Sequence, residues 1–322
     1  MAPRGLPRRR VPTWGSVVYV ARRLVHGLGV LLGVSLLVFG LTWLTGDPVT
    51  VLVPLNTPPA EMARLRHELG LDRPVVVQYV DFVAHAVRGD FGTSLRHRAP
   101  ALPLVIERLP ATLLLLASAL LVTLGLGVPL GIVAAAFSGR APDLLARLAA
   151  LLGQSLAAPW LGLLLILLFA VQLRWLPSSG AARPEALVLP AFVAGLYPAA
   201  GLTRLLRAGL LEALSAEYVR AARGKGLPER LVVWRHALKN AALPVVTFVG
   251  VQVAFLFGNS VVAEAIFAYP GTGRLAVDAI GARDLPLIQA FVTLAAVVVV
   301  LVNLFVDLLY VWLDPRVRLE RA

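Results

Sequence analysis

Metal sites, nucleophiles and nucleotide sites are most often built from cysteine, histidine and lysine, and their placement here suits none of the three. The chain has no cysteine, and its five histidines form neither an H-x-x-x-H nor an H-E-x-x-H pair. The only Gly-Lys pair, Gly224-Lys225, is followed by Gly226 instead of Ser or Thr, so it is not a phosphate-binding P-loop. No Ser, His and Asp are grouped for nucleophilic chemistry. We therefore predict no catalytic residue, no metal site and no nucleotide site in this chain.

One basic, polar segment has the composition of a surface that binds another molecule. Residues 217–246 read EYVRAARGKGLPERLVVWRHALKNAALPVV and lie between two strongly apolar stretches. Arg220 and Arg223 carry planar guanidinium groups that suit carboxylates. Ala221 and Ala222 lie between them, and their small side chains would let a second surface approach the helix backbone closely.

Helix-ending residues divide this segment into two predicted helices. Gly226 tolerates the left-handed backbone that ends a helix, and Pro228 fits the first turn of the next one. We expect the second helix to reach about Ala242, before Pro244 begins a new apolar stretch. Such helices could rest on lipid headgroups or dock on a protein, and the residues alone leave both interpretations open.

The rest of the composition indicates a membrane protein. Hydrophobic residues make up 58% of the 322 residues and charged residues 15%, against roughly 25% charged in soluble domains. The formal net charge of +12 would suit either nucleic acid or an anionic lipid surface. Because the mean hydropathy is +0.81, we favour membrane lipid and predict no nucleic-acid partner.

Six apolar stretches are long enough to cross a bilayer, whose core takes about 20 helical residues. They are Leu24–Leu44, Thr112–Phe137, Leu148–Leu173, Ala186–Thr203, Val245–Phe267 and Pro286–Leu313. The fourth contains Pro190 and Pro198, which would kink it. A signal peptide is the alternative for the first, but its apolar run exceeds the usual length of about 7–15 residues, so we interpret it as an uncleaved span. The sequence thus predicts an all-α membrane protein with six transmembrane helices.

Basic residues set the predicted orientation of these spans. Most of the 30 Lys and Arg residues fall on the side of the two termini, many of them in residues 1–23 and 204–242. We therefore predict that residues 1–23, the loop 204–242 and the tail 314–322 are cytoplasmic. The loop 45–111 is then extracytoplasmic. This describes a multi-pass protein of the cytoplasmic (inner) membrane with both termini in the cytoplasm.

Uncharged polar residues interrupt the last two predicted spans. Gln252 and Asn259 are seven residues apart and share one helix face, with Ser260 beside them, and Asn303 lies on the last span. Such residues are costly in lipid and usually face a protein interior or water. They could line a translocation path or hold helices together by hydrogen bonds, and both interpretations remain open. These four residues are our candidates for the path.

The pattern around Ala221 resembles the cytoplasmic signature loop of permeases from binding-protein-dependent ABC importers, in which Glu-Ala-Ala is followed after three residues by Gly. Arg220 takes the Glu position, Ala221 and Ala222 match the alanines, and Gly226 matches the glycine. The stretches YVRAARGKGL and RHALKNAALPV are similar to those of the dipeptide, oligopeptide and nickel subfamily.

This resemblance covers nearly the whole chain. The stretches LLGVSLLVFGLTWLTGDP, GDFGTSL, ERLPATLLL, EAIFAYPGTGRLAVDAI, RDLPLIQA and VDLLYVWLDPRVR follow one another in the subfamily's order. Only SLAAPWLG departs from it, since the family more often has Pro and Phe near Ser155. The resemblance implies the type I ABC importer permease fold, with a transmembrane core over residues 112–313 and a cytoplasmic coupling helix in the loop 204–242.

By the same resemblance, ATP and Mg bind on partner ATPases, and this chain supplies the coupling helix that contacts them. The residues expected at that contact are Glu217, Arg220, Ala221, Ala222, Arg223, Lys225, Gly226 and Leu227. The expected partners are a second homologous permease subunit, two ABC ATPase subunits and an extracytoplasmic substrate-binding protein. The loop 45–111 would face the binding protein, and a solvated cap without partner contact is the alternative for this loop.

The sequence therefore predicts a transport subunit without enzymatic activity of its own. Its substrates would be short peptides, nickel complexes or related solutes. The alternative is a stand-alone secondary carrier, which would need ionisable residues inside the spans, and Asp307 and Glu264 are the candidates. That alternative leaves the coupling-helix pattern unexplained.

Overall fold

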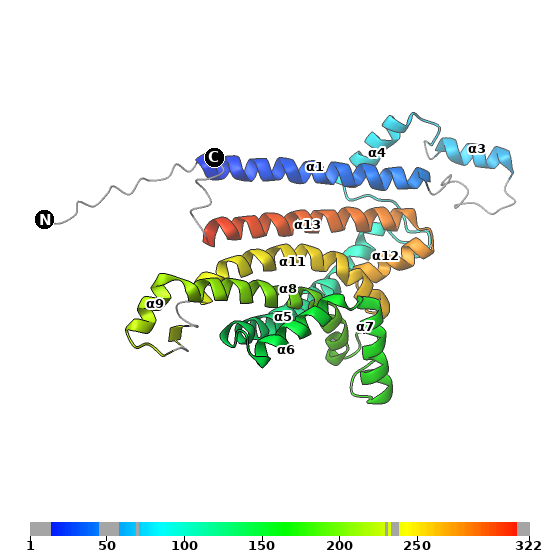
Figure 1. Ribbon diagram of the computed structural model, residues 1–322. Coiled ribbons are helices and arrows are strands. Elements are labelled where there is room, and N and C mark those ends of the chain that lie inside the picture. The colour runs from blue at the N-terminus through cyan, green and yellow to red at the C-terminus, as the bar shows by residue number, and fades with distance from the viewer. Residues whose placement is uncertain (1–13, 45–57, 69–70, 229–230, 233–237, 314–322) are drawn as a thin grey trace.

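The computed structural model describes residues 14–44, 58–68, 71–228, 231–232 and 238–313. Helices dominate these residues, and most of the long ones run in similar directions (Figure 1). In chain order the elements are α1 (Trp14–Leu44), α3 (Pro59–Glu68), α4 (Val75–Val87), α5 (Ala101–Ala136), α6 (Ala141–Ser155), α7 (Ala158–Leu165), η1 (Ile166–Gln172), η2 (Pro184–Leu187), α8 (Val188–Ser215), α9 (Glu217–Gly224), α11 (Leu238–Ile266), α12 (Thr272–Gly281) and α13 (Leu285–Leu313).

Within the described residues, five helical stretches are long and apolar enough to cross a membrane. They are Arg22–Gly40, Ala101–Ala136, Pro184–Ser215, Pro244–Ile266 and Leu285–Val306. A helix suits this role because it satisfies its backbone N–H and C=O groups internally, where hydrocarbon offers no water to do so. The prediction of an all-α membrane protein is confirmed, and a sixth crossing is available from a bent pair of helices.

This bent pair covers the span predicted for Leu148–Leu173. The first helix, α6, meets the stretch formed by α7 and η1 at 104°. Leu156 and Ala157 between them are extended, with ψ angles of 125° and 129°. The physical reason is Pro159, which has no N–H to donate and whose ring would clash with the carbonyl of Ser155 in a continuous helix.

The fourth predicted span, which Pro190 and Pro198 were expected to kink, is the most buried of the five candidate spans. In the 18-residue apolar segment of Pro184–Ser215, 67% of the residues are buried, against 28% in the corresponding segment of α5 and 11% in that of α13. Pro190 lies in the first turn of α8, where its missing N–H costs little, and Pro198 lies inside the helix. The helix contacts α5, α6, α7 and α11, so it occupies the centre of the bundle.

Small residues allow α5 and α8 to approach each other closely. A Cβ atom on Gly195 of α8 would lie only 2.5 Å from the carbonyl oxygen of Ala119 on α5. A Cβ on Gly127 of α5 would similarly lie 2.8 Å from the side chain of Leu202. The hydroxyl of Thr123 donates a hydrogen bond to the Gly195 carbonyl at 3.1 Å. Close backbones joined by hydroxyl hydrogen bonds are typical of helix pairs in membranes.

Both ends of the predicted loop 204–242 belong to long helices in the structure. Helix α8 continues to Ser215, and α11 already begins at Leu238 and passes through Pro244. The predicted end of the second helix at about Ala242 is therefore wrong, because residues 238–242 belong to α11, and residues 229–230 and 233–237 lie outside the described ones. The predicted spans ended at the first polar residues, whereas the helices continue beyond the apolar core.

The predicted loop 45–111 contains helical structure in its described part. Helices α3 and α4 lie within it, and α5 begins at Ala101 instead of Thr112. At 1.5 Å per residue, the 36 residues of α5 span roughly 54 Å, more than the ~30 Å of a bilayer core. Its charged first turns, which include Glu107 and Arg108, therefore extend beyond the hydrocarbon.

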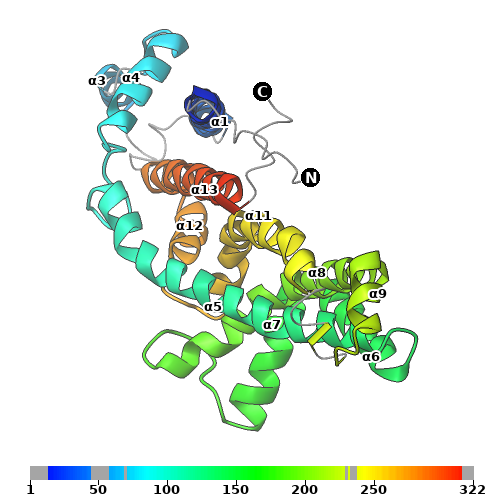
Figure 2. The same cartoon turned by 90° about the vertical axis from the view of Figure 1, so that its left-hand side faces the viewer.

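Helices α1 and α13 lie at one edge of the bundle (Figure 2). Helix α1 also contacts α4, where Ser35 Oγ and Tyr79 Oη are 2.8 Å apart. The start of α1, the end of α13 and α9 lie at the same end of the molecule, whereas α3 and α12 lie at the opposite end (Figure 1). The terminal segments, residues 1–13 and 314–322, lie outside the described residues.

The close approach of α5 and α8 makes a prediction about Gly195. We expect Gly195→Ala to lower the midpoint of thermal unfolding in detergent, because an added methyl group in a packed helix interface costs about 1–3 kcal/mol. Gly125→Ala on α5 is the matched control, since a Cβ there meets no atom within 4 Å. Equal midpoints for the two variants would contradict the packing described here.

Candidate functional site

Helix α9 has a well-defined C-terminal end. Gly226 adopts a left-handed backbone with φ +78°, and its N–H donates to the carbonyl of Arg223 at 2.9 Å. The N–H of Leu227 reaches back to the carbonyl of Ala222 at 3.4 Å. This pair of bonds is the Schellman arrangement that ends helices. At the other end, Glu217 places a negative charge in the first turn, where the helix dipole favours it.

The predicted contact residues lie on two different faces of α9. Val219 and Ala222 are buried and Leu227 is half-buried, and they pack in a small apolar cluster with Val232 and Leu214. The exposed members of the predicted set are Glu217, Arg220, Ala221, Arg223, Lys225 and Gly226. Ala222 and Leu227 therefore hold the helix in place. Of the two alanines, only Ala221 is available to a second surface.

A single extended residue, Ala216, joins α8 to α9. Its ψ of 151° turns the chain, and α9 then packs back through Val219 against Leu214 of α8. Because α8 is itself packed against α5, α6 and α11, a displacement of α9 would be passed directly to the centre of the bundle.

A buried ion pair joins α6 to α8 on the α9 side of α8. Asp143 is only 1% exposed, and its two carboxylate oxygens accept hydrogen bonds from Arg207 Nε and Nη2 at 2.7 and 2.8 Å. The N–H of Gly139 donates to the same carboxylate at 3.0 Å, and Arg147 Nε lies 3.2 Å from it. Such bidentate pairs are strong and directional. Sequence reasoning misses this site, because only the Asp143–Arg147 spacing is readable locally.

A second buried carboxylate ties the end of α11 to α12. Glu264 is fully buried, and its Oε2 accepts hydrogen bonds from the N–H groups of Gly273 at 2.6 Å and Arg274 at 3.0 Å. Thr112 Oγ1 donates to Oε1 at 2.8 Å. Glu264 thus caps a helix that has no side-chain cap from its own N-cap residue. The contacts of Glu264 thus connect α11 to α12 within the fold. The side chain of Asp307, the other candidate for ion coupling, lies outside the part of the chain that the structure describes.

Two glycines make room for this carboxylate. A Cβ on Gly271 would clash with the carboxyl group of Glu264, and one on Gly273 would lie 2.6 Å from the Cα of Val261. Burial raises the pKa of the nearby Tyr269 hydroxyl above its ordinary value, and the negative charge of Glu264 adds to this. The glycines of the PGTG stretch are thus a steric requirement of the Glu264 cap.

A third buried carboxylate, Asp284, holds the GDFGTSL stretch at the end opposite α9. Ser94 Oγ and the N–H of Arg96 donate to its Oδ2 at 2.5 and 3.2 Å. Phe91 is buried among residues of α5, α12 and α13. Phe91 and Ser94 therefore anchor this stretch to the fold, while Asp90, Gly92, Thr93 and Leu95 are exposed. Residues 96–98, which read Arg-His-Arg, are exposed beside it.

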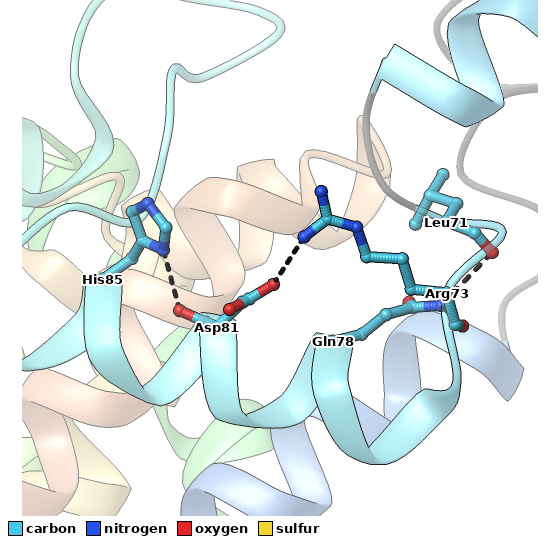
Figure 3. Close-up of polar contacts among 5 residues, drawn as sticks. All are labelled: Leu71, Arg73, Gln78, Asp81 and His85. Carbon is cyan, nitrogen blue, oxygen red and sulfur yellow. Dashed lines mark hydrogen bonds and ion pairs between the residues drawn. The ribbon is translucent and has the colours of Figure 1, made fainter.

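Polar side chains of α4 and of the segment just before it form hydrogen bonds at the same end (Figure 3), beside exposed valines of α4. Arg73 Nη1 donates to Asp81 Oδ2 at 3.3 Å, and Gln78 Nε2 donates to the carbonyl of Leu71 at 3.2 Å. His85 Nδ1 lies 2.7 Å from the carbonyl of Asp81. The side chains of Arg73 and Asp81 are both more than half exposed, so water screens their pairing.

The four predicted path residues lie in different surroundings. Asn259 lines a cavity between α8, α11 and the break between α6 and α7. Ser260 is buried and donates to the carbonyl of Phe257 at 2.9 Å. Gln252 is 8% exposed, and Asn303 is exposed on α13. Only Asn259 of the four lines this cavity, and the path role of the set stays a prediction.

The helix arrangement is similar to that of chains in two solved ABC transporter structures. A crystal structure of an amino acid ABC transporter with histidines matches with a TM-score of 0.50 at 17% identity, covering 66% of this chain and 94% of that one. The MetNI methionine ABC transporter in inward facing conformations matches with a TM-score of 0.55 at 19% identity, covering 66% and 96%. At these identities the likeness shows the fold alone.

Sequence comparisons identify the family. Residues 127–319 match the model described as "Binding-protein-dependent transport system inner membrane component", and residues 17–116 match "Binding-prot-dependent transport system membrane comp, N-term". The chain belongs to this family of inner-membrane components and is a multi-pass permease subunit of an ABC importer. The resemblance noted in the sequence is confirmed.

Two relatives show how far the similarity extends. The glutathione transport system permease protein GsiC of Salmonella typhimurium (strain LT2) is 40% identical over 301 residues, which are 93% of this chain and 98% of that protein. The protein of the same name from Escherichia coli (strain K12) is also 40% identical over the same shares. The similarity thus includes both ends of the bundle and the α9 region.

The α6–α8 ion pair predicts that Asp143→Asn destabilises the protein. The substitution leaves the Arg207 guanidinium without its carboxylate in a half-buried position, so the midpoint of thermal unfolding in detergent should fall. Asp81→Asn removes an exposed ion pair on α4 and should change the midpoint little. If both variants unfold at the wild-type temperature, the Asp143 pair does not hold the helices together.

The fit of Gly273 predicts a local effect at α12. In Gly273→Ala the added Cβ would displace Glu264 from the start of α12 and loosen the segment between α11 and α13. We expect trypsin to cleave faster after Arg274 or Arg283, measured by mass spectrometry of the purified protein. Gly281→Ala, on the same helix but with no atom within 4 Å of the new Cβ, should be cleaved like the wild type. Identical cleavage rates for both variants would argue against the cap.

Proposed function

We propose that this permease subunit moves short peptides, such as the tripeptide glutathione, inward across the cytoplasmic membrane. The support is the 40% identity, over 93% of the chain, to permeases named for glutathione transport. The importer would contain this chain, a second homologous permease, two ABC ATPase subunits and an extracytoplasmic substrate-binding protein. ATP and Mg bind on the ATPase subunits.

Helix α9 is proposed as the coupling helix that docks on an ATPase subunit. The observation that carries this proposal is an exposed basic face on a helix that one residue joins to the central span. Arg220 and Lys225 would meet carboxylates of the partner, and Ala221 would let its surface approach closely. The buried Ala222 and the half-buried Leu227 would keep α9 fixed to the end of α8.

The proposed orientation follows from this docking. The start of α1, α9 and the end of α13 share one end of the bundle, which would face the cytoplasm with its basic residues. The opposite end, with α4 and the exposed residues 96–98, would face the extracytoplasmic binding protein.

Transport would then proceed by movement of packed helices. Closure of the ATPase pair pushes α9, and the short link at Ala216 passes the push to α8. The bidentate contact of Arg207 with Asp143 carries the movement from α8 to α6, next to the break in the third span. The spans thereby switch between inward-open and outward-open arrangements.

The coupling proposal is tested with Gly226→Val in the complete importer. Valine at φ +78° strains the backbone by an amount on the order of 1–3 kcal/mol and distorts the end of α9. We expect peptide uptake into proteoliposomes to fall strongly while ATP hydrolysis persists, which is the signature of uncoupling. Gly180→Val is the matched control, because Gly180 has φ +85° and equally open space but lies outside α9 and away from the Asp143 ion pair. Unchanged uptake in Gly226→Val at equal protein level would contradict the coupling role.

A further inference from the structure

A cavity of about 430 Å³ lies where the third span breaks. The end of α6 and the start of α7 form one side of it, and α8 and α11 form the others. This volume falls within the roughly 300–1,000 Å³ of small-molecule sites. Among its lining residues are Gln154, Ser155, Leu161, Tyr197, Phe255 and Asn259.

The break places polar backbone groups beside this cavity. A helix that stops leaves its last carbonyls without donors from a following turn. The N–H of Leu156 still donates to Leu152 at 3.1 Å, but Pro159 has no N–H to offer the carbonyl of Ser155. Irregular backbone at membrane depth is tolerated only where it is buried in protein or lines a water-filled cavity. The unpaired backbone groups at the break therefore favour a polar molecule in the adjoining cavity.

Two side-chain amides reach the same cavity from different helices. Gln154 of α6 and Asn259 of α11 both line it, and neither has a hydrogen-bond partner among the described residues. Each amide offers a donor and an acceptor, which is the complement of a peptide group with its N–H and C=O. None of the residues lining the cavity is charged. The chemistry of the lining thus fits peptide bonds and not the charged ends of a peptide.

Two aromatic rings form an apolar wall beside these amides. The ring centroids of Tyr197 and Phe255 are 5.8 Å apart, and both side chains are nearly half exposed. Such rings accept apolar groups readily while the tyrosine hydroxyl remains available for hydrogen bonding. Asn259 is exposed as well, so the cavity is open on this side in the single chain. In the proposed importer the second permease subunit would close it.

We propose that this cavity binds the peptide groups of the transported solute. Gln154 and Asn259 form hydrogen bonds with the peptide backbone, and Tyr197 and Phe255 contact its side chains. The inference rests on the proposed function, and it adds a substrate site within the membrane that selects for uncharged amide groups.

The first test adds a charge to the cavity without changing its shape. Gln154→Glu is introduced into the complete importer, and uptake of the dipeptides Ala-Lys and Ala-Glu into proteoliposomes is compared. A carboxylate in the cavity should raise the ratio of Ala-Lys to Ala-Glu uptake on the order of tenfold. Gln172→Glu makes the same exchange on the same bent pair of helices, outside the cavity, and should keep the wild-type ratio.

The second test measures protection of the cavity by peptide. Because the chain has no cysteine, Ser155→Cys creates its only thiol. A dipeptide supplied in excess with the binding protein should slow labelling of this thiol by a water-soluble maleimide several-fold. Ser118→Cys is the matched control, since both serine hydroxyls donate to a carbonyl four residues earlier and Ser118 does not line the cavity. Its labelling should not respond to peptide.

The outcomes separate this inference from the proposed function. If the wild-type importer takes up both dipeptides, an unchanged ratio in Gln154→Glu or unprotected labelling of Ser155→Cys overturns the cavity site and leaves the proposed function intact. A wild-type importer that takes up neither dipeptide nor glutathione overturns the proposed function, and the cavity site falls with it.

Discussion

A helix in hydrocarbon keeps its backbone N–H and C=O groups paired within itself, because no water is present to replace a lost partner. The long spans of this permease remain helical through Pro129, Pro198 and Pro244, although each proline removes one N–H from the helix. The described residues depart from it between α6 and α7, where Leu156 and Ala157 are extended and a cavity lies alongside. The exception therefore coincides with the place where the bundle has room for a polar occupant.

Buried carboxylates hold the ends of the spans in place. Asp143 connects α6 to α8, Glu264 connects α11 to α12, and Asp284 connects the GDFGTSL stretch to the start of α13. A buried charge is tolerated only when several donors surround it, and each of these carboxylates has at least three. The connections between spans are thus fixed to the helices. We expect a bundle built this way to move as packed units, as the proposed coupling role of α9 requires.

The local signals in the sequence were sufficient for the class of protein and for the end of α9. Apolar runs predicted the membrane helices, and Gly226 predicted the helix end that the Schellman hydrogen bonds complete. Helix boundaries were less accurate. Helix α8 runs to Ser215 and α11 begins at Leu238, because a helix continues past the hydrocarbon wherever its polar face finds water or protein. Burial of Ala222 was also missed, since it depends on Val232 and Leu214.

By itself, the sequence determined that the chain crosses a membrane as helices, that it has no P-loop of its own, and that a basic helix follows the fourth span. These properties depend on composition and on neighbours a few residues apart. Only the tertiary structure decided which polar groups meet. Asp143 finds Arg207, Glu264 finds the start of α12, and Gln154 shares a cavity with Asn259. Those pairings join separate helices, and no local spacing encodes how one helix is rotated against another.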